Sequence, residues 1–223
     1  MSINLDWSQI DDVMLDMDGT LLDLHFDSHF WLEYVPQKYA EYKHLSIEEA
    51  KDELLGRYKR IEGTLEWYCV DHWSRELELD IALLKEEVDH LIAVHPFVVD
   101  FLDAVKQAGK RTILVTNAHQ KSLALKMKKT RLDHHFDEIV SAHQLGHPKE
   151  AQEFWAKLHA CLPFNPARTL FVDDSVSVLK AARQYGIINV LAILKPDTTE
   201  PQRVLKGFEG VAGFAELLPA LHS

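Results

Sequence analysis

The chain has 223 residues, 47% of them hydrophobic and 26% charged, which is typical of one folded α/β-sized domain with or without a smaller insert. Its 35 acidic and 24 basic residues give a formal charge of −11, which disfavours nucleic acid and anionic membranes as partners but allows a small phosphate ester in a locally positive cleft. Two cysteines are too few for a disulfide framework. We see no signal peptide and no membrane-length apolar run, and we therefore expect a cytoplasmic protein. The oligomeric state stays open.

The first buried strand is predicted at residues 13–15 and runs directly into an acidic motif, the octet Asp16 to Asp23. The carboxylates of Asp16 and Asp18 point to the same side while the chain is extended. Gly19 follows them and allows both a tight turn and a close approach of the backbone to a ligand. A lone pair of acids at this spacing is often only a solvated strand end, but the complete octet is far more specific.

Residues 24–92 contain no convincing strand and are predicted to form several helices. The sequence at 46–49 has the form of a capping box, and an apolar stripe at helical spacing follows it. Three of the five tryptophans and five of the six tyrosines lie in this segment, and we expect most of them to build its core. We therefore predict a helical cap at 24–92, inserted in a core domain made of residues 1–23 and 93–223.

Strands alternate with amphipathic helices from residue 94 onward. Further buried strands are predicted at 112–115, 138–140, 169–172 and 189–192. One helix is predicted over 96–108, and another begins at Ser175 and stops at Gly186. Such alternation implies right-handed crossovers and a parallel sheet, so the predicted fold class is α/β with a Rossmann-like sheet.

Polar residues follow several of these strands. Thr116 and Asn117 end the second strand, although both residue types are also common helix caps. Lys149 lies near the start of the helix after the third strand, where a lone lysine is usually a surface charge. Asp173 and Asp174 directly follow the buried fourth strand, which is unusual for solvated acids. Because the carboxyl ends of parallel strands share one edge of a sheet, their order predicts a single site there.

Several carboxylates brought together at this edge would repel one another by roughly 4 kcal/mol per pair at about 4 Å and an effective dielectric near 20. A bound cation removes that cost, and oxygen ligands without clustered cysteine or histidine favour Mg²⁺ over zinc. The 13 histidines do not change this prediction. The pairs His134–His135 and His143/His147 do not combine a helical H-x-x-x-H spacing with a supporting acid, and we expect surface or loop roles for them.

The set of motifs resembles the four signature motifs of the haloacid dehalogenase (HAD) superfamily, and the helical insert resembles its C1 cap. The resemblance implies a Mg²⁺-dependent phosphohydrolase with Asp16 as nucleophile and Asp18 as general acid and base. It also implies that Mg²⁺ is held by Asp16, by the backbone carbonyl of Asp18 and by Asp174, with Asp173 nearby. The phosphate oxygens would be bound by Thr116, Asn117 and Lys149.

Most of the chain is also similar to bacterial 5′-nucleotidases of this superfamily that act on GMP and IMP. This narrower resemblance implies a purine nucleoside monophosphate as substrate. The candidate contacts are His119, beside the phosphate loop, and three residues on a predicted helix opened by Thr64, namely Trp67, Tyr68 and His72. One departure from the common pattern is Glu150, because proline often follows the lysine of the third motif.

Other functions on the same fold stay open. A 2-haloacid dehalogenase needs no acid at position 18, so Asp18 favours phosphate chemistry. A phosphomutase, or a phosphatase acting on a sugar phosphate or phosphoglycolate, would carry the same motifs. A binding module that has lost catalysis ranks last, because no acid and no lysine of the motifs is missing.

Overall fold

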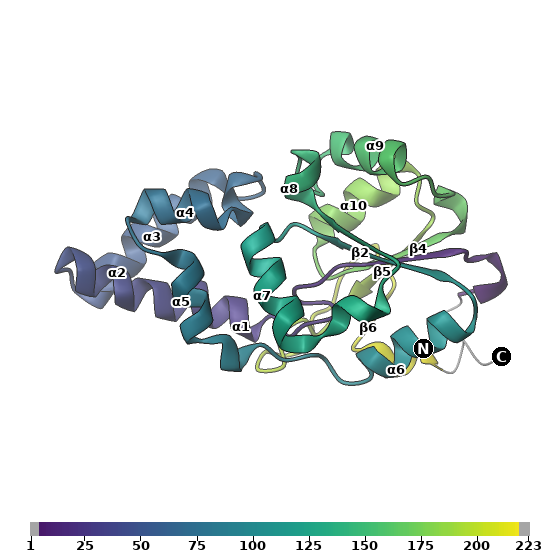
Figure 1. Cartoon of the computed structure of the whole chain (residues 1–223), viewed down its shortest axis with the longest axis horizontal. Helices are drawn as coiled ribbons and strands as arrows, with labels where there is room; N and C mark the ends of the chain where they lie inside the picture. The colour runs from purple at the N-terminus through teal and green to yellow at the C-terminus, as the bar shows by residue number, and fades with distance from the viewer. Residues whose placement is uncertain (1–4, 219–223) are drawn as a thin grey trace.

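The computed structural model describes residues 5–218, which form two parts along the long axis of the molecule (Figure 1). One part is a sheet flanked by helices, and the other consists of the helices between residues 25 and 91. The two chain connections between the parts are hydrogen-bonded to each other. The Asp23 amide donates to the Ala93 carbonyl oxygen at 2.9 Å, and the His95 amide donates to the Leu21 carbonyl oxygen at 2.9 Å. The two chain connections to the helical part therefore lie side by side.

Six strands form one parallel sheet in the order β3-β2-β1-β4-β5-β6. They are β1 (Asp12–Leu15), β2 (Arg111–Thr116), β3 (Glu138–Ser141), β4 (Thr169–Asp173), β5 (Asn189–Ile193) and β6 (Gly210–Val211). The predicted α/β class and its five strands are confirmed, whereas β6 has two residues and is too short to show a hydrophobic pattern. The strand order reverses between β1 and β4, which is where open sheets of this kind bind ligands.

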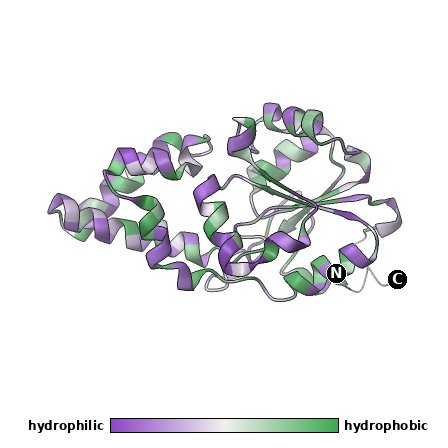
Figure 2. Cartoon of the chain, in the orientation of Figure 1, coloured by the Kyte–Doolittle hydropathy of each residue, from purple (hydrophilic) through white to green (hydrophobic). Residues whose placement is uncertain are grey.

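Alternate residues of the strands build two separate cores, one on each face of the sheet. Val13 and Leu15 pack in one core, and Met14, between them, packs in the other. Helices cover both faces, so the strands are apolar on both sides. The helices of this part are α6 (Val98–Gln107), α7 (Gln120–Thr130), α8 (Ala142–Leu145), α9 (Gln152–Cys161) and α10 (Val176–Tyr185). Figure 2 shows hydrophobic and hydrophilic residues alternating along the helices, as this packing requires.

The ends of two helices follow the predicted signals closely. The helix predicted over 96–108 is α6, which begins at Val98 because Phe97 adopts a left-handed conformation, with φ at 63°. The helix predicted after Ser175 is α10, and it ends before Gly186, whose φ of +117° terminates the helix.

The helical part buries aromatic side chains that are continuous with the core on one face of the sheet. Its helices are α1 (His25–His29), α2 (Val35–Lys43), α3 (Ile47–Ile61), α4 (Val70–Leu77) and α5 (Ile81–Glu87). Phe26, Phe30 and Trp73 are fully buried within it. The predicted capping box is confirmed, with reciprocal hydrogen bonds between Ser46 and Glu49 at the start of α3. Within residues 5–218, none of the helices combines the length and the apolar character needed to cross a lipid bilayer.

The helix predicted to open at Thr64 is wrong. A short 3₁₀ turn at Glu66–Tyr68 is followed by α4, which begins at Val70. Cys69 between them has an extended backbone, with φ at −86° and ψ at 109°, and its sulfur accepts a hydrogen bond from the His72 amide. The chain therefore changes direction at Cys69, and a residue at 67 or 68 does not share a helix face with residue 72.

Candidate active site

The carboxyl ends of three neighbouring strands bring the polar motifs together. Leu15 of β1 lies level with Leu114 of β2 and Val172 of β4. Asp16 and Asp173 therefore come directly after residues that are paired in the sheet, and the Asp16 amide donates to the Val172 carbonyl oxygen at 3.0 Å. The site thus forms at the reversal of strand order.

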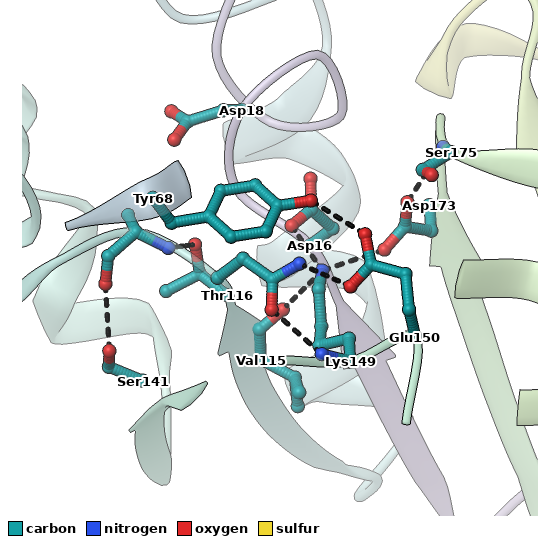
Figure 3. A network of polar contacts seen from close by, with 12 residues as sticks. Asp16, Asp18, Tyr68, Val115, Thr116, Ser141, Lys149, Glu150, Asp173 and Ser175 are labelled. Carbon is teal, nitrogen blue, oxygen red and sulfur yellow. Dashed lines mark hydrogen bonds and ion pairs between the residues drawn. The ribbon is translucent and has the colours of Figure 1, made fainter. Parts of the chain in front are cut away.

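Lys149 lies at the centre of this site and is 2% exposed. It enters from the segment between α8 and α9, and its Nζ donates to Asp16 Oδ1 at 2.5 Å and to Asp173 Oδ2 at 2.7 Å. A third bond, of 3.0 Å, reaches the Val115 carbonyl oxygen (Figure 3). Burial lowers the pKa of this lysine, but the two carboxylates more than offset that effect and raise it. Lys149 is therefore charged and joins the first, third and fourth motifs.

The neighbouring carboxylates are not neutralised by one lysine. Burial raises the pKa of Asp16 to about 6, against the attraction of Lys149, and repulsion from Asp173 adds to the rise. Burial followed by repulsion from Asp173 and Asp16 raises the pKa of Asp174 well above its usual range. The group therefore carries excess negative charge when it is ionised, and a cation would stabilise it.

The residues present fit a hard divalent cation. Oxygen atoms of Asp16, Asp173 and Asp174 lie within 4.8 Å of one another. Gly19, with φ at +82°, leaves room for this cluster, since a Cβ there would come within 2.8 Å of Asp174 Cγ. The buried hydroxyl of Thr20 has no hydrogen-bond partner within residues 5–218. Carboxylate oxygens are the donors that Mg²⁺ prefers, so the predicted cation matches the donor set.

Asp18 lies apart from the group around Lys149 (Figure 3). Its Oδ1 accepts a hydrogen bond of 2.6 Å from Lys126 Nζ, a fully buried lysine on α7. Lys126 also binds Asp27, which in turn pairs with Lys85 of α5 at 2.9 Å. Burial raises the pKa of Asp18 to about 6, against the attraction of Lys126. This carboxyl can therefore exchange a proton near neutral pH, as a general acid and base must.

Thr116 and Asn117 shape the loop after β2. The Thr116 hydroxyl oxygen accepts a hydrogen bond of 3.0 Å from the Ala118 amide. The Asn117 side chain is occupied on both sides: its oxygen accepts from the Lys149 amide at 2.8 Å, and its nitrogen donates to Glu150 Oε2 at 3.0 Å. The side chain of Asn117 thus positions the lysine loop.

Glu150 connects the two parts of the molecule. Its Oε1 accepts a hydrogen bond of 2.6 Å from the Tyr68 hydroxyl, while its Oε2 accepts from Asn117 (Figure 3). Burial, followed by the charge of Glu150, raises the pKa of Tyr68, so its hydroxyl keeps its proton and donates. Glu150 stands where the resemblance to the superfamily leads us to expect proline. Its side chain bonds to both parts of the molecule.

A cavity of about 740 Å³ lies between the two parts and contains the site. Among the residues from the core motifs that line it are Asp16, Asp18, Thr116, Asn117, His119, Lys149, Asp173 and Asp174. The helical part contributes aromatic side chains, Trp31, Tyr58, Trp67, Tyr68 and Trp73. The predicted contact His72 lies outside the lining and packs edge-on against Trp73, with ring centroids 5.1 Å apart.

Several charged residues in or beside the cavity were not predicted from the sequence. Lys126, Lys85 and Asp27 form a buried ion-pair network, and Arg203 donates to the Asp174 carbonyl oxygen at 2.9 Å. Both lysines left a signal, because Lys126 shares the buried face of α7, and Lys85 that of α5, with apolar residues at helical spacing.

Comparisons with known proteins agree with this geometry. Residues 10–186 match the family of haloacid dehalogenase-like hydrolases. The chain is 38% identical over 221 residues to the GMP/IMP nucleotidase YrfG of Escherichia coli (strain K12). This alignment covers 99% of this chain and 100% of that protein. It is 25% identical over 182 residues to the pyrophosphatase PpaX of Anoxybacillus flavithermus, covering 79% and 80% of the two chains. The crystal structure of a HAD phosphatase from Thermococcus onnurineus has a TM-score of 0.81 at 21% identity, covering 95% and 98%. This chain is a phosphatase that belongs to the haloacid dehalogenase-like hydrolase family.

Proposed function

We propose that this phosphatase hydrolyses purine nucleoside 5′-monophosphates, GMP and IMP before AMP, through a phosphorylated Asp16. The observation that carries the substrate is the 38% identity, along the whole chain, to a protein named as a GMP/IMP nucleotidase. The cavity supports this substrate, because its volume of about 740 Å³ is in the range of small-ligand sites. Its aromatic wall, which includes Trp31 and Trp67, offers flat surfaces on which a purine can stack.

In the proposed reaction, an Asp16 oxygen attacks phosphorus in line and the ester P–O bond breaks. Asp18 gives its proton to the leaving oxygen, then takes a proton from the water that attacks the aspartyl-phosphate and releases inorganic phosphate. The Thr116 hydroxyl, the backbone amide of Asn117 and Lys149 bind the non-bridging oxygens. Bound Mg²⁺ supplies positive charge that offsets the phosphate and the carboxylates.

We assign the Mg²⁺ ligands to Asp16, Asp174 and the backbone carbonyl of Asp18, with Asp173 in an outer role. Both Asp173 oxygens are already engaged, Oδ1 by the Ser175 amide at 2.8 Å and Oδ2 by Lys149. Activity should vanish with EDTA and return with Mg²⁺. Asp174→Ala should raise the Mg²⁺ concentration needed for half-maximal activity more than Asp173→Ala does, and the opposite order would exchange the two roles.

We further propose that residues 24–92 act as a cap that closes over a core of residues 1–23 and 93–223 in a cytoplasmic enzyme. The hydrogen-bonded connections at Asp23 and His95 offer one hinge for this motion. Closure would exclude water from the aspartyl-phosphate until hydrolysis and would bring Tyr68 to a substrate that His119 contacts from the core.

The test of the substrate is kcat/KM with Mg²⁺ for GMP, IMP, AMP, glucose 6-phosphate and phosphoglycolate. GMP and IMP share a 6-oxo group that AMP lacks, so a site that binds this group should prefer them by on the order of tenfold or more. Equal or higher values for a sugar phosphate or phosphoglycolate would overturn the nucleotidase proposal, while loss of all activity in Asp16→Asn would still support the phosphatase chemistry.

A further inference from the structure

A second group of potential metal ligands lies beside the cavity and consists of Cys69, His119 and His143. One donor atom from each lies within 4.8 Å of the other two. Cys69 precedes α4 in the helical part, His119 precedes α7, and His143 lies in α8. The three come from distant parts of the sequence, so only the tertiary structure assembles them. The two imidazole rings pack edge to face, with centroids 4.9 Å apart.

His143 has a buried ring nitrogen that makes no hydrogen bond with the described residues. Its Nε2 has no hydrogen-bond partner within residues 5–218. Buried polar atoms are almost always bonded, so an orphan nitrogen indicates an absent partner. Neutral imidazole is the form that binds metals. The expectation of an ordinary surface or loop role for His143 does not account for this buried atom.

Cys69 places its sulfur at the amino end of α4. The sulfur accepts a hydrogen bond of 3.3 Å from the His72 amide. The other cysteine, Cys161, is exposed and lies at the end of α9 without histidine neighbours in such a group.

His119 can complete the group at a small cost. Its Nδ1 accepts a hydrogen bond of 3.3 Å from the Lys121 amide, and its Nε2 lies 3.7 Å from Asp71 Oδ2. Binding a metal through Nε2 moves the ring proton to Nδ1 and gives up the bond to Lys121. The fourth position would be filled by water or by the Asp71 carboxylate.

We propose that Cys69, His119 and His143 form a second metal site, for Zn²⁺ or a similar divalent transition metal. One thiolate and two imidazoles are a recognised zinc donor set and a poor one for Mg²⁺. Metal–ligand bonds of about 2.0–2.3 Å place tetrahedral donors about 3.5 Å apart, which small side-chain rotations would achieve from the observed positions. Since Cys69 belongs to the helical part and the histidines to the sheet part, the bound metal would cross-link the two parts at the edge of the cavity.

The probe is Co²⁺ added to the reduced, EDTA-treated full-length protein in the presence of excess Mg²⁺. We expect a thiolate-to-cobalt charge-transfer band and tetrahedral d–d bands that saturate at one equivalent and disappear when Zn²⁺ is added. The carboxylate site has no sulfur and cannot produce the charge-transfer band, so the readout does not depend on the proposed function. The bands should be lost in Cys69→Ser and His143→Gln.

Matched controls are Cys161→Ser and His134→Gln, which change an exposed cysteine and a histidine whose side chain is 75% exposed. Both should keep the spectrum of the wild-type protein. Thermal unfolding of all four variants without metal shows whether each is folded. Absence of a charge-transfer band in the wild-type protein, or its persistence in folded Cys69→Ser, would overturn the second metal site.

Discussion

At the scale of single residues, the site contains one buried lysine among three carboxylates. Lys149 binds Asp16 and Asp173, whereas the salt bridge of Asp174 is to Arg203, with the charged atoms 3.6 Å apart. The raised pKa values of the acids show that the protein without Mg²⁺ holds them at an energetic cost. The acids proposed to carry the chemistry therefore also limit the stability of the fold.

Replacing Asp16 by Asn should abolish phosphatase turnover without unfolding the protein. The amide is nearly isosteric but is not a nucleophile, and we expect kcat to fall by on the order of 10³-fold or more. Lys149 keeps its bonds to Asp173 and the Val115 carbonyl. The measurement is kcat together with the thermal midpoint, and Asp52→Asn at an exposed position of α3 is the control. Substantial hydrolysis by purified Asp16→Asn would contradict the covalent mechanism.

Replacing Asp174 by Asn should stabilise the protein at pH 7 when Mg²⁺ is absent. The folded pKa of Asp174 is raised above its unfolded value, so the folded state binds more protons between the two values. The stability that comes from this extra proton binding is fully present below about pH 3.9, and it is lost as the pH rises through the folded pKa. The Asn variant avoids this loss, and its free energy of unfolding should exceed that of the wild type at pH 7.

The measurement is urea unfolding of both proteins with EDTA at several pH values. The difference between them should shrink as the pH falls toward 4. Saturating Mg²⁺ should reverse the order, because only the wild-type carboxylate can bind the cation. A less stable Asn variant at pH 7 without metal would show that the acid is not repelled by its neighbours.

At the scale of elements, the turn after β1 depends on a glycine. Gly19 has φ at +82°, and a Cβ there would come within 2.8 Å of Asp174 Cγ. The turn is closed by the Gly19 amide, which donates to the Leu22 carbonyl oxygen at 2.8 Å. Backbone conformation and side-chain crowding therefore both require glycine beside the acidic cluster.

Three glycine-to-alanine variants separate these two requirements. Gly63 has φ at +78° with open space around it, and Gly56, inside α3, has neither a positive φ nor a neighbour within 4 Å. Gly63→Ala should lower the free energy of unfolding by about 1–2 kcal/mol without changing the Mg²⁺ requirement. Gly56→Ala should raise it by up to about 1 kcal/mol.

Gly19→Ala should lower the free energy of unfolding by about 1–2 kcal/mol, as Gly63→Ala does. It should also lose most of its activity, because Asp174 must move. The measurements are urea unfolding and activity against Mg²⁺ concentration for all three variants. Normal activity in Gly19→Ala would show that Asp174 does not need its observed position.

At the scale of the whole molecule, polar contacts from several elements hold the helical part over the site. The Tyr68 hydroxyl binds Glu150, and Lys121 of α7 binds Asp71 of α4 at 2.6 Å on an exposed surface. The Lys126–Asp27 pair forms a further contact next to Asp18. Because exposed ion pairs contribute little, we expect the buried bonds to matter more for the closed arrangement.

Removing the Tyr68 hydroxyl should weaken this arrangement. Tyr68→Phe leaves one oxygen of Glu150 without its donor, which should cost about 1–3 kcal/mol of unfolding free energy. The measurements are urea unfolding and the rate of limited proteolysis at the two connections near Asp23 and His95. Tyr42→Phe, at a 48% exposed side chain, is the control and should behave as wild type. Equal stability of both variants would indicate that Glu150 is hydrated.

The sequence by itself determined the parallel sheet, most helix ends and the position of the motifs, since these depend on local order. Buried strands appear as short apolar runs, and Ser46 and Gly186 mark helix ends through bonds or dihedral angles of their own neighbourhood. The order of strands places Asp16 and Asp173 at one edge of the sheet. The helix expected from Thr64 failed because the extended Cys69 interrupts it, and nothing in the local pattern marks that break.

Only the tertiary structure decided how the charges are paired and which residues meet between the two parts. Lys126 binds Asp18 across 108 positions of the sequence, and Glu150 binds Tyr68 across 82. The group of Cys69, His119 and His143 is likewise assembled by packing. A buried charge or polar atom must find a partner wherever the fold supplies one, and no local periodicity records which distant residue that will be.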